Sequence, residues 1–376
     1  MCSMGFDDMS IRLRDYHQGY RIAALALDDC TKEKLLAKDL SVVYVSDGCA
    51  ALLPDNIVLH AEPEQLNYLG QYNNYDVVEI WENGILNRRY NDKSNDNYFF
   101  VTGACNSNCV MCPSPEVTRR NVPKTNIEDL INLARHIPSD APHLTITGGE
   151  PFLVGECIFP FLQFLKENLP CTEFLFLTNG RIFAIDKFVK QFVENAPCNS
   201  TVAIPVHGSC DSIHDSITRA DGSFKQTIRG IKQLLRNGIR IEIRLVVGRL
   251  NISDFDRIAD LIISQFPGVE YVSVIAMEMT GNARRNQEQV WVPYRESFDH
   301  ISEAIRRMVE NGVDVRLYNF PLCTVQKSFW TLCEKSISEN KVRFGEVCDE
   351  CKYRSACGGV FAGTFQLEKD ELKAIL

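Results

Sequence analysis

The chain has 376 residues, of which 45% are hydrophobic and 24% are charged, and its formal net charge is −9. This composition is typical of a soluble globular protein with room for one large α/β domain and one or two smaller ones. The negative charge disfavours a nucleic-acid scaffold, because binding phosphates relies on a basic surface. The first residues lack the basic and apolar regions of a signal peptide, and no apolar run approaches the ~18 residues of a membrane span. We therefore expect a cytoplasmic protein with no membrane partner.

Residues 1–96 are predicted to form a small β-rich domain, because short apolar runs such as 42–45 and 57–59 are separated by Asp, Gly and Pro. Two apolar runs around Asn83 and Gly84 predict a β-hairpin over 76–88. The polar stretch 91–96 predicts a linker. This domain carries no obvious chemistry.

From residue 97 onward, strand and helix patterns alternate, which is typical of parallel strands joined by crossover helices. Ser223 and Gln226 predict a capping box at the start of one helix, and Gly238 suits a left-handed cap at its end. We expect a partial (β/α)6 TIM barrel over 97–290 and a cysteine-rich C-terminal extension over 291–376. The six barrel strands are predicted at 98–101, 144–147, 174–177, 202–208, 239–247 and 271–277, and a further strand of the extension at 313–318.

Three cysteines with the spacing Cys-x3-Cys-x2-Cys follow the first barrel strand, at Cys105, Cys109 and Cys112. Disulfides are rare in a reducing cytoplasm, so clustered cysteines favour metal ligation. A structural zinc usually takes four ligands, whereas three cysteines on a four-iron cluster leave one iron open. The triplet therefore favours an iron–sulfur cluster over buried thiols that act as small hydrophobic residues.

The second strand ends at Gly148, Gly149, Glu150 and Pro151, where a parallel barrel gathers its active-site loops. Two glycines let the backbone approach a ligand closely, so that carbonyls can accept hydrogen bonds from an ammonium group. The alternative interpretation is a simple turn.

The third strand ends at Thr178, Asn179 and Gly180. Polar side chains at this position can face a ribose or a substrate. The alternative interpretation is a turn in which Gly180 has a positive φ.

The fifth strand alternates apolar and charged residues. Ile241, Ile243 and Leu245 lie on one face, and Arg240, Glu242 and Arg244 lie on the other. In a barrel the apolar face packs under helices, so the charged row is expected to face the lumen. An edge strand with one face in water is the alternative.

A second set of cysteines lies in the C-terminal extension. Four cysteines, one distant and three clustered, can close a metal site completely, and the site can hold either a second iron–sulfur cluster or zinc. Cys333 falls outside the spacing and is expected to take no part. The four candidate ligands are Cys323, Cys348, Cys351 and Cys357.

The cysteine triplet followed by the Gly-Gly-Glu-Pro sequence resembles the radical S-adenosylmethionine (SAM) superfamily. The resemblance implies that the triplet holds a [4Fe-4S] cluster whose open iron binds SAM, and that one electron cleaves SAM to a 5′-deoxyadenosyl radical. It implies that residues 148–151 bind the amino group of SAM and that Thr178 and Asn179 lie near ribose or substrate. Met111 occupies a position that is usually aromatic and lies against the adenine.

The same resemblance suggests where the SAM carboxylate is bound. Many relatives have a serine where this chain has Pro205, so His207, Ser209 and Arg244 are the candidates here. The C-terminal cysteines resemble the end of the SPASM and twitch extensions, which hold auxiliary [4Fe-4S] clusters in peptide-modifying enzymes. Phe361 stands where the full SPASM pattern has another cysteine, so one auxiliary cluster is expected.

As a set, the motifs over residues 97–361 are similar to the radical SAM maturase of the His-Xaa-Ser system, the HxsC type. This similarity implies an iron–sulfur oxidoreductase that modifies a ribosomally made peptide or small protein, together with a partner maturase and a reductant such as flavodoxin or ferredoxin. Arg284 and Arg285 could then contact substrate, although a solvated basic pair is the commoner situation. A radical SAM enzyme acting on a small molecule and a non-catalytic metal-binding scaffold stay open as alternatives.

Overall fold

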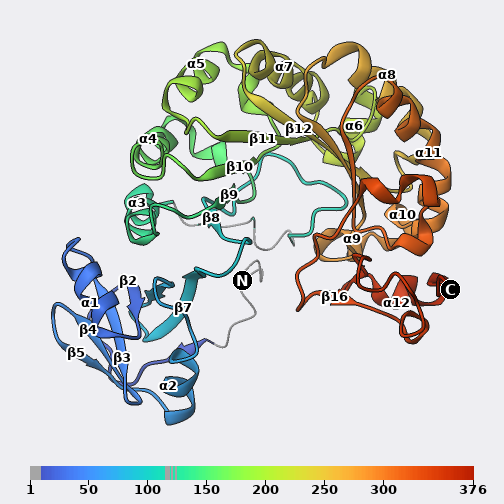
Figure 1. The fold of residues 1–376 in the computed structure, drawn as a ribbon. Helices are drawn as coiled ribbons and strands as arrows, with labels where there is room; N and C mark the ends of the chain where they lie inside the picture. The colour runs from blue at the N-terminus through green and yellow to red at the C-terminus, as the bar shows by residue number, and fades with distance from the viewer. Residues whose placement is uncertain (1–9, 115–118, 120–121, 123–124) are drawn as a thin grey trace.

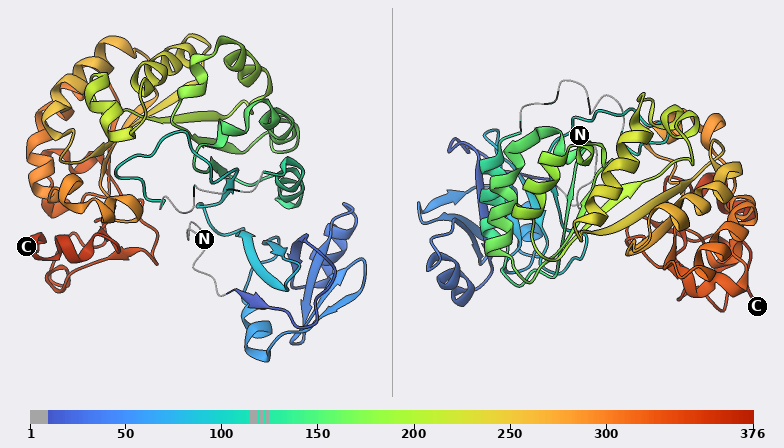
Figure 2. Two further views of the ribbon diagram at one scale, coloured as in Figure 1. Left: turned by 180° about the vertical axis from the view of Figure 1, so that it is seen from behind. Right: turned by 90° about the horizontal axis from the view of Figure 1, so that it is seen from above.

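The computed structural model describes residues 10–114, 119, 122 and 125–376. Within them the chain forms a seven-stranded N-terminal sheet, an eight-stranded parallel sheet and a two-stranded sheet near the C-terminus. Figure 1 shows the parallel sheet curved into an open arc with helices around its outside, and Figure 2 shows the same arrangement from behind and from above. The N-terminal domain lies at one end of the arc, and the C-terminal segment lies at the other.

The N-terminal sheet has the order β1-β7-β6-β2-β3-β4-β5 and is antiparallel except where β2 pairs with β3. The predicted hairpin is confirmed, because β6 and β7 pair around a turn in which Gly84 has a φ of +78°. Ile22, Val77 and Tyr90 belong to the same buried cluster as the barrel, so this domain is packed onto the barrel. Its elements are β1 (Ile11–Arg12), β2 (Arg21–Ala26), α1 (Asp29–Leu36), β3 (Val42–Ser46), β4 (Cys49–Leu53), β5 (Ile57–Leu59), α2 (Pro63–Leu69), β6 (Val77–Ile80) and β7 (Ile85–Tyr90).

The parallel sheet contains strands in chain order from β8 to β15. The six predicted barrel strands are all present, but the sheet does not stop there. The strand predicted at 313–318 pairs in parallel with β13, and a further short strand pairs with it in turn. The strands are β8 (Tyr98–Phe100), β9 (His143–Thr147), β10 (Glu173–Leu177), β11 (Ser200–Pro205), β12 (Arg240–Val247), β13 (Tyr271–Ala276), β14 (Val315–Tyr318) and β15 (Cys333–Glu334).

Helices cover the outer face of this sheet, and their apolar sides pack against its strands in one continuous core. The larger helices are α3 (Ile127–His136), α4 (Phe159–Asn168), α5 (Asp186–Asn195), α6 (Asp211–Thr218), α7 (Ser223–Arg236), α8 (Phe255–Gln265) and α11 (Tyr294–Glu310). The shorter elements near the C-terminal end are α9 (Gly281–Arg285), α10 (Gln287–Val290), β16 (Val342–Arg343), β17 (Val360–Phe361) and α12 (Phe365–Glu368).

The start of α7 differs from the sequence prediction. The predicted capping box is wrong, because Ser223 does not cap the helix from its own position and Gln226 instead accepts a hydrogen bond from Arg181. The carboxylate of Asp215 caps the helix, accepting from the backbone N–H groups of Gly222 and Phe224, both at 2.7 Å. The C-terminal prediction is confirmed, since Gly238 follows the helix with a φ of +72°.

The alternating pattern of the fifth barrel strand is confirmed. Ile241, Ile243 and Leu245 are fully buried in the core under the helices. Because β12 lies between β11 and β13, it is not an edge strand. Glu242, on the opposite face, is buried and accepts hydrogen bonds from Ser273 at 2.6 Å and from Tyr271 at 3.2 Å.

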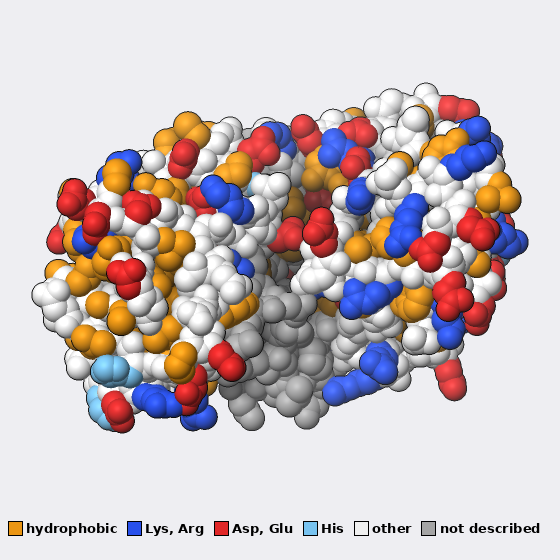
Figure 3. Space-filling model, turned by 60° about the horizontal axis from the view of Figure 1, so that its bottom comes forward, with side chains coloured by type: hydrophobic (Ala, Val, Ile, Leu, Met, Phe, Trp, Pro, Cys, Tyr) orange, Lys and Arg blue, Asp and Glu red, His pale blue; other side chains and the backbone are white. Residues whose placement is uncertain are grey.

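Acidic and basic side chains are interspersed on the surface that Figure 3 shows. Within the described residues, no helix is both long and apolar enough to cross a membrane.

Candidate active site

The cysteine loop, residues 101–112, leaves β8 and is braced by the Gly-Gly-Glu-Pro turn after β9. The backbone N–H of Gly149 donates to the carbonyl of Thr102 at 2.7 Å, and that of Glu150 donates to the carbonyl of Ala104 at 2.8 Å. A Cβ on Gly149 would lie 2.4 Å from the carbonyl oxygen of Gly103. Position 149 therefore needs glycine because the backbone of this turn packs directly against the cysteine loop.

The other side of the loop is held by residues that the sequence analysis did not assign to the site. The side-chain amide of Asn282 donates to the carbonyl of Cys109 at 3.1 Å, and that of Asn286 donates to the carbonyl of Val110 at 2.8 Å. Both asparagines belong to the segment after β13. The sequence feature that could have indicated this role is the presence of amide side chains just after a barrel strand, where the active-site loops of a barrel gather.

The three thiols of the triplet are partly buried and lie close enough to influence one another. Burial, with the neighbouring Cys112 and Cys105, raises the pKa of Cys109 to about 12. Burial also raises the pKa of Cys105. Without a cation these thiols stay protonated, and a bound iron reverses this by favouring the thiolate.

Glu150 is a hub of hydrogen bonds and not a free carboxylate. It is 2% exposed and accepts from the Thr178 hydroxyl and the Asn179 backbone N–H, both at 2.7 Å. Burial raises its pKa above the ordinary value, although these hydrogen bonds oppose the shift. Its side chain thus locks the end of β9 to the end of β10.

In the turn after β10 the positive φ predicted for Gly180 is confirmed, while the role of Thr178 and Asn179 near ribose or substrate stays a prediction. Gly180 has a φ of +74°, as a turn glycine should. The side-chain amide of Asn179 donates to Asn106 of the cysteine loop at 2.7 Å, and Arg181 donates to the carbonyl of Asn106 at 2.6 Å. The polar residues of this turn are therefore engaged with the cysteine loop.

The three candidates for binding the SAM carboxylate have different surroundings. Ser209 is committed to Asp254, to which its hydroxyl donates at 2.8 Å and its backbone N–H at 2.7 Å. Arg244 is partly exposed and donates to Glu242 at 3.0 Å.

His207 is buried, and among the described residues its Nδ1 has no hydrogen-bond partner. Burial, with the nearby His214, lowers the pKa of His207 to about 3, so the ring is neutral. A buried polar atom that has no partner in the protein can be satisfied by a polar ligand. Of the three candidates, His207 is therefore the one whose side chain has an unused hydrogen-bonding atom.

A small apolar pocket lies beside the cysteine loop. Met111 lines it, as do Val246 and Leu250 from the end of β12. A Cβ on Gly248 would lie 2.5 Å from Cε of Met277, so this glycine leaves room for the flexible Met277 side chain in the pocket wall. Val246, Gly248 and Leu250 were not among the residues predicted for the site.

The four candidate cysteines of the C-terminal extension line one cavity. Backbone N–H groups donate to their sulfur atoms: Leu322 and Gly359 donate to Cys357, each at 3.4 Å, and Ile375 donates to Cys351 at 3.4 Å. Cys323 and Cys348 likewise accept from the backbone of Lys373 and Gly345.

This donor set fits an iron–sulfur cluster, because amide hydrogen bonds to sulfur stabilise thiolate ligands and help set the reduction potential. Among the described residues, no three His, Cys, Asp or Glu side chains converge on a point where one metal ion could be held. Cluster thiolates bind separate irons and so do not need to converge in this way.

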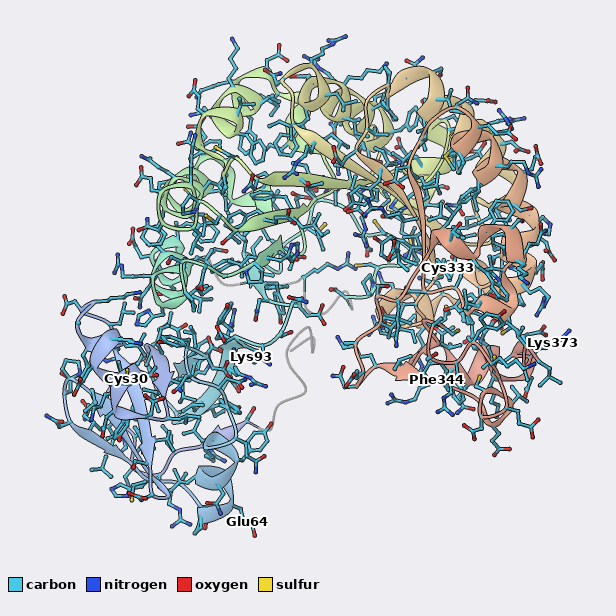
Figure 4. The ribbon with its side chains drawn as sticks, in the orientation of Figure 1. Cys30, Glu64, Lys93, Cys333, Phe344 and Lys373 are labelled. Atoms are coloured by element: carbon cyan, nitrogen blue, oxygen red, sulfur yellow. The ribbon has the colours of Figure 1, made fainter. Side chains whose placement is uncertain are left out.

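Cys333 lies apart from this lining. It sits on β15 at the edge of the parallel sheet, and its thiol points toward the backbone carbonyl of Phe329 at 3.8 Å. Figure 4 shows it together with Phe344 and Lys373, two residues that do line the cavity.

Comparison with known proteins identifies the core. Residues 99–262 match the family model of the radical SAM superfamily. The matched segment contains the cysteine loop and most of the barrel strands, so this part of the chain is the radical SAM core of an enzyme. No curated protein matches the chain.

Solved structures resemble it more distantly. Streptococcus suis SuiB bound to precursor peptide SuiA has 13% identity and a TM-score of 0.48, with 58% of this chain and 48% of that chain covered. The structure of anSMEcpe with bound AdoMet and Kp18Cys peptide has 14% identity and a TM-score of 0.45, with 58% and 62% covered. A domain of pyruvate-formate lyase-activating enzyme from Bacteroides vulgatus has 14% identity and a TM-score of 0.38, with 47% and 98% covered. The chain thus covers about half the length of SuiB.

Proposed function

We propose that this enzyme cleaves SAM reductively and uses the resulting radical to modify a ribosomally made peptide or small protein, in the manner of the His-Xaa-Ser maturases. The observation that carries the first part is the juxtaposition of the cysteine loop, the glycine turn that braces it and the apolar pocket beside Met111. An electron source, a backbone cradle for the amino acid end of the ligand and an apolar surface beside them are what SAM cleavage needs at one place.

Each part of this site has a distinct task. Cys105, Cys109 and Cys112 would hold the [4Fe-4S] cluster, which supplies the electron for cleavage and the iron that binds the amino acid end of SAM. The carbonyls of Gly148 and Gly149 would accept hydrogen bonds from the ammonium group. The apolar residues around Met111 would exclude water from the adenine side of the ligand. The neutral ring of His207, whose Nδ1 has no hydrogen-bond partner among the described residues, would accept or donate one hydrogen bond to the ligand.

The C-terminal extension supports the proposal that the substrate is a peptide. Its four cysteines surround one cavity and accept backbone hydrogen bonds, which supports one auxiliary [4Fe-4S] cluster. The similarity of the motif set to the His-Xaa-Ser maturases supports a peptide or small protein as the substrate that such a cluster serves. On this proposal residues 1–96, 97–290 and 291–376 are the N-terminal domain, the radical SAM core and the auxiliary cluster domain.

Anaerobic reconstitution tests the first part. The protein with iron, sulfide, dithionite and SAM should contain about eight irons and form 5′-deoxyadenosine. Cys109→Ala should lose about four irons and all cleavage. Cys157→Ala, which removes an exposed thiol outside both sites, should change neither. The formation of 5′-deoxyadenosine by Cys109→Ala would contradict the assignment of the site.

Co-expression with short reading frames encoded beside the gene, followed by mass spectrometry, tests the second part. A mass change in a peptide containing His-Xaa-Ser repeats, absent with Cys109→Ala, is the expected result. The small-molecule alternative would be favoured if the enzyme cleaves SAM and turns over a small metabolite but changes the mass of no peptide encoded beside the gene. Zinc in place of iron at the C-terminal cysteines would refute the auxiliary cluster.

A further inference from the structure

A groove on the outside of the barrel carries a concentration of positive charge. It lies between α5 and α7, which are neighbours at the top of Figure 1. Five of its lining residues are basic, namely Lys190, Lys225, Arg229, Lys232 and Arg236, and one, Asp186, is acidic. The whole chain has a net charge of −9, so this groove departs from the character of the rest of the surface.

Internal ion pairing does not neutralise the groove. Arg229 pairs with Asp186 at 3.2 Å, and Lys225 lies 3.6 Å from Asp211. Both ion pairs are exposed, so each contributes little free energy and can exchange partners. No described residue pairs with Lys190 or Arg236, both of which are exposed.

One end of the groove is linked to the cysteine loop through two consecutive hydrogen bonds. Phe224 and Lys225 line the groove next to Ser223, whose hydroxyl lies 2.6 Å from that of Thr218. The carbonyl of Thr218 accepts the backbone N–H of Asn108 at 2.9 Å. Asn108 is the residue before Cys109, so a short covalent and hydrogen-bonded path joins the groove to a cluster ligand.

A second path enters the barrel through aromatic rings. The ring of Phe224, in the groove wall, lies 5.7 Å from that of His214, which lies 5.4 Å from that of His207. Arg181 also links the two regions, because it donates to Gln226 on α7 at 2.7 Å and to Asn106 of the cysteine loop at 2.6 Å.

We propose that the α5–α7 groove is the docking surface for an acidic, one-electron redox protein of the flavodoxin class. This inference rests on the proposed function, because only a reductively driven cluster needs such a partner. One electron leaves the reduced flavin of the partner and enters the oxidised cluster of the cysteine triplet. No bond is formed or broken in this chain. Charge complementarity selects the partner and speeds encounter, while the short path beside Phe224 sets where the electron enters.

Binding of oxidised flavodoxin to the reconstituted enzyme tests the proposal without relying on turnover. Affinity measured by calorimetry should fall steeply as salt rises, because the contacts are exposed charge pairs. Lys190→Glu combined with Arg236→Glu should weaken binding roughly tenfold or more, since each change replaces attraction with repulsion. These residues make no ion pair within the described chain, so the fold should persist.

The matched control is Lys34→Glu on α1 of the N-terminal domain combined with Lys38→Glu just after this helix, which changes the net charge equally. It should leave the affinity within about twofold of the unaltered enzyme. Equal weakening by both double variants, or no binding of flavodoxin at any salt concentration, would overturn the proposal. Tight binding of a single-stranded oligonucleotide in the groove with no binding of flavodoxin would overturn it as well.

Dithionite separates this inference from the proposed function, because a small chemical reductant needs no docking surface. The groove variant should cleave SAM normally with dithionite and slowly with reduced flavodoxin. Failure of the unaltered enzyme to cleave SAM with dithionite would refute the proposed function. Normal cleavage with dithionite but no effect of the groove variant on flavodoxin binding would refute the docking surface alone.

Discussion

The glycine pair at the end of β9 lets the backbone of this turn pack closely against the cysteine loop. A Cβ on Gly148 would meet the carbonyl oxygen of Thr102 at 2.4 Å, and one on Gly149 would meet two carbonyl oxygens of the cysteine loop. Backbone oxygens cannot rotate away as flexible side chains do. The glycines therefore set the position of the cysteine loop before any ligand is bound.

Gly149→Ala should accordingly damage the protein itself and not only its affinity for SAM. The added methyl group must push the loop carbonyls outward, and we expect a loss of about 3 kcal/mol in the free energy of unfolding, at the upper end of overpacking effects. Urea unfolding measures this loss, and iron analysis should show the triplet's cluster depleted. Gly70→Ala is the control, because its Cβ would meet no atom closer than 3.4 Å. An unchanged stability for Gly149→Ala would contradict this account.

At the scale of elements, the segment after β13 acts as a clamp on the cysteine loop. The backbone N–H of Asn282 donates to the carbonyl of Cys112 at 2.8 Å, in addition to the side-chain contacts of Asn282 and Asn286. Gly281 is needed there, because a Cβ would lie 2.1 Å from the carbonyl oxygen of Pro113.

Asn286→Ala should loosen this clamp. It leaves the carbonyl of Val110 without its amide donor, a loss of about 1–3 kcal/mol for a buried polar group. We expect the triplet's cluster to lose iron to a chelator faster, while the auxiliary site keeps its iron. The control is Asn311→Ala, which removes a comparable side-chain amide bond, to the carbonyl of Arg307, at the exposed end of α11. Equal iron retention in both variants would show that the clamp is dispensable.

A buried carboxylate joins the C-terminal segment to the barrel. Glu368 of α12 accepts the backbone N–H of Tyr294 at 3.1 Å, and Tyr294 donates to the carbonyl of Met277 at 2.9 Å. Burial raises the pKa of Glu368 to about 7. From its ordinary pKa up to about pH 7, the folded chain holds a proton that the unfolded chain has released, so this group lowers stability as pH rises through that window.

Glu368→Gln should remove this pH dependence, because an amide keeps the acceptor for Tyr294 without the charge. The variant should match the unaltered protein in stability near pH 4.5 and exceed it above about pH 7.5. Thermal unfolding at both pH values gives the comparison. Glu310→Gln, at the exposed end of α11, should leave the pH profile as it was. A variant less stable than the unaltered protein at high pH would show that the charge is needed.

Strand positions, the charged row of β12 and the left-handed cap at Gly238 could be predicted from sequence because each depends on local pattern alone. The helix cap of α7 could not, since Asp215 lies eight residues before Ser223 and a capping box is judged from nearest neighbours. Likewise Asn282 reaches Cys109 across 173 residues of chain, and no periodicity reports such a contact. The sequence predicted the strand at 313–318 but not its pairing with β13, nor the pairing of β15 with β14. The residues of a strand do not specify which other strand lies beside it.

At the scale of the whole molecule, two cysteine sites occupy different parts of one open arc. The triplet follows β8 at the start of the parallel sheet, and the C-terminal four lie beyond its last strands. Thr364 bridges the two regions, because its hydroxyl accepts the backbone N–H of Met279 at 3.0 Å, just before the segment that clamps the cysteine loop. The sites are thus mechanically connected but built from separate ligands.

Removing the C-terminal site should therefore uncouple cleavage from modification. Cys351→Ala should lose about four irons and the change in peptide mass, yet still form 5′-deoxyadenosine with dithionite, because the triplet's ligands and apolar pocket are untouched. The sharpest control is Cys333→Ala, which removes a nearby half-buried thiol that does not line the cavity, and it should keep all the iron. Iron loss in Cys333→Ala equal to that in Cys351→Ala would place Cys333 among the ligands and require a different ligand set for the auxiliary site.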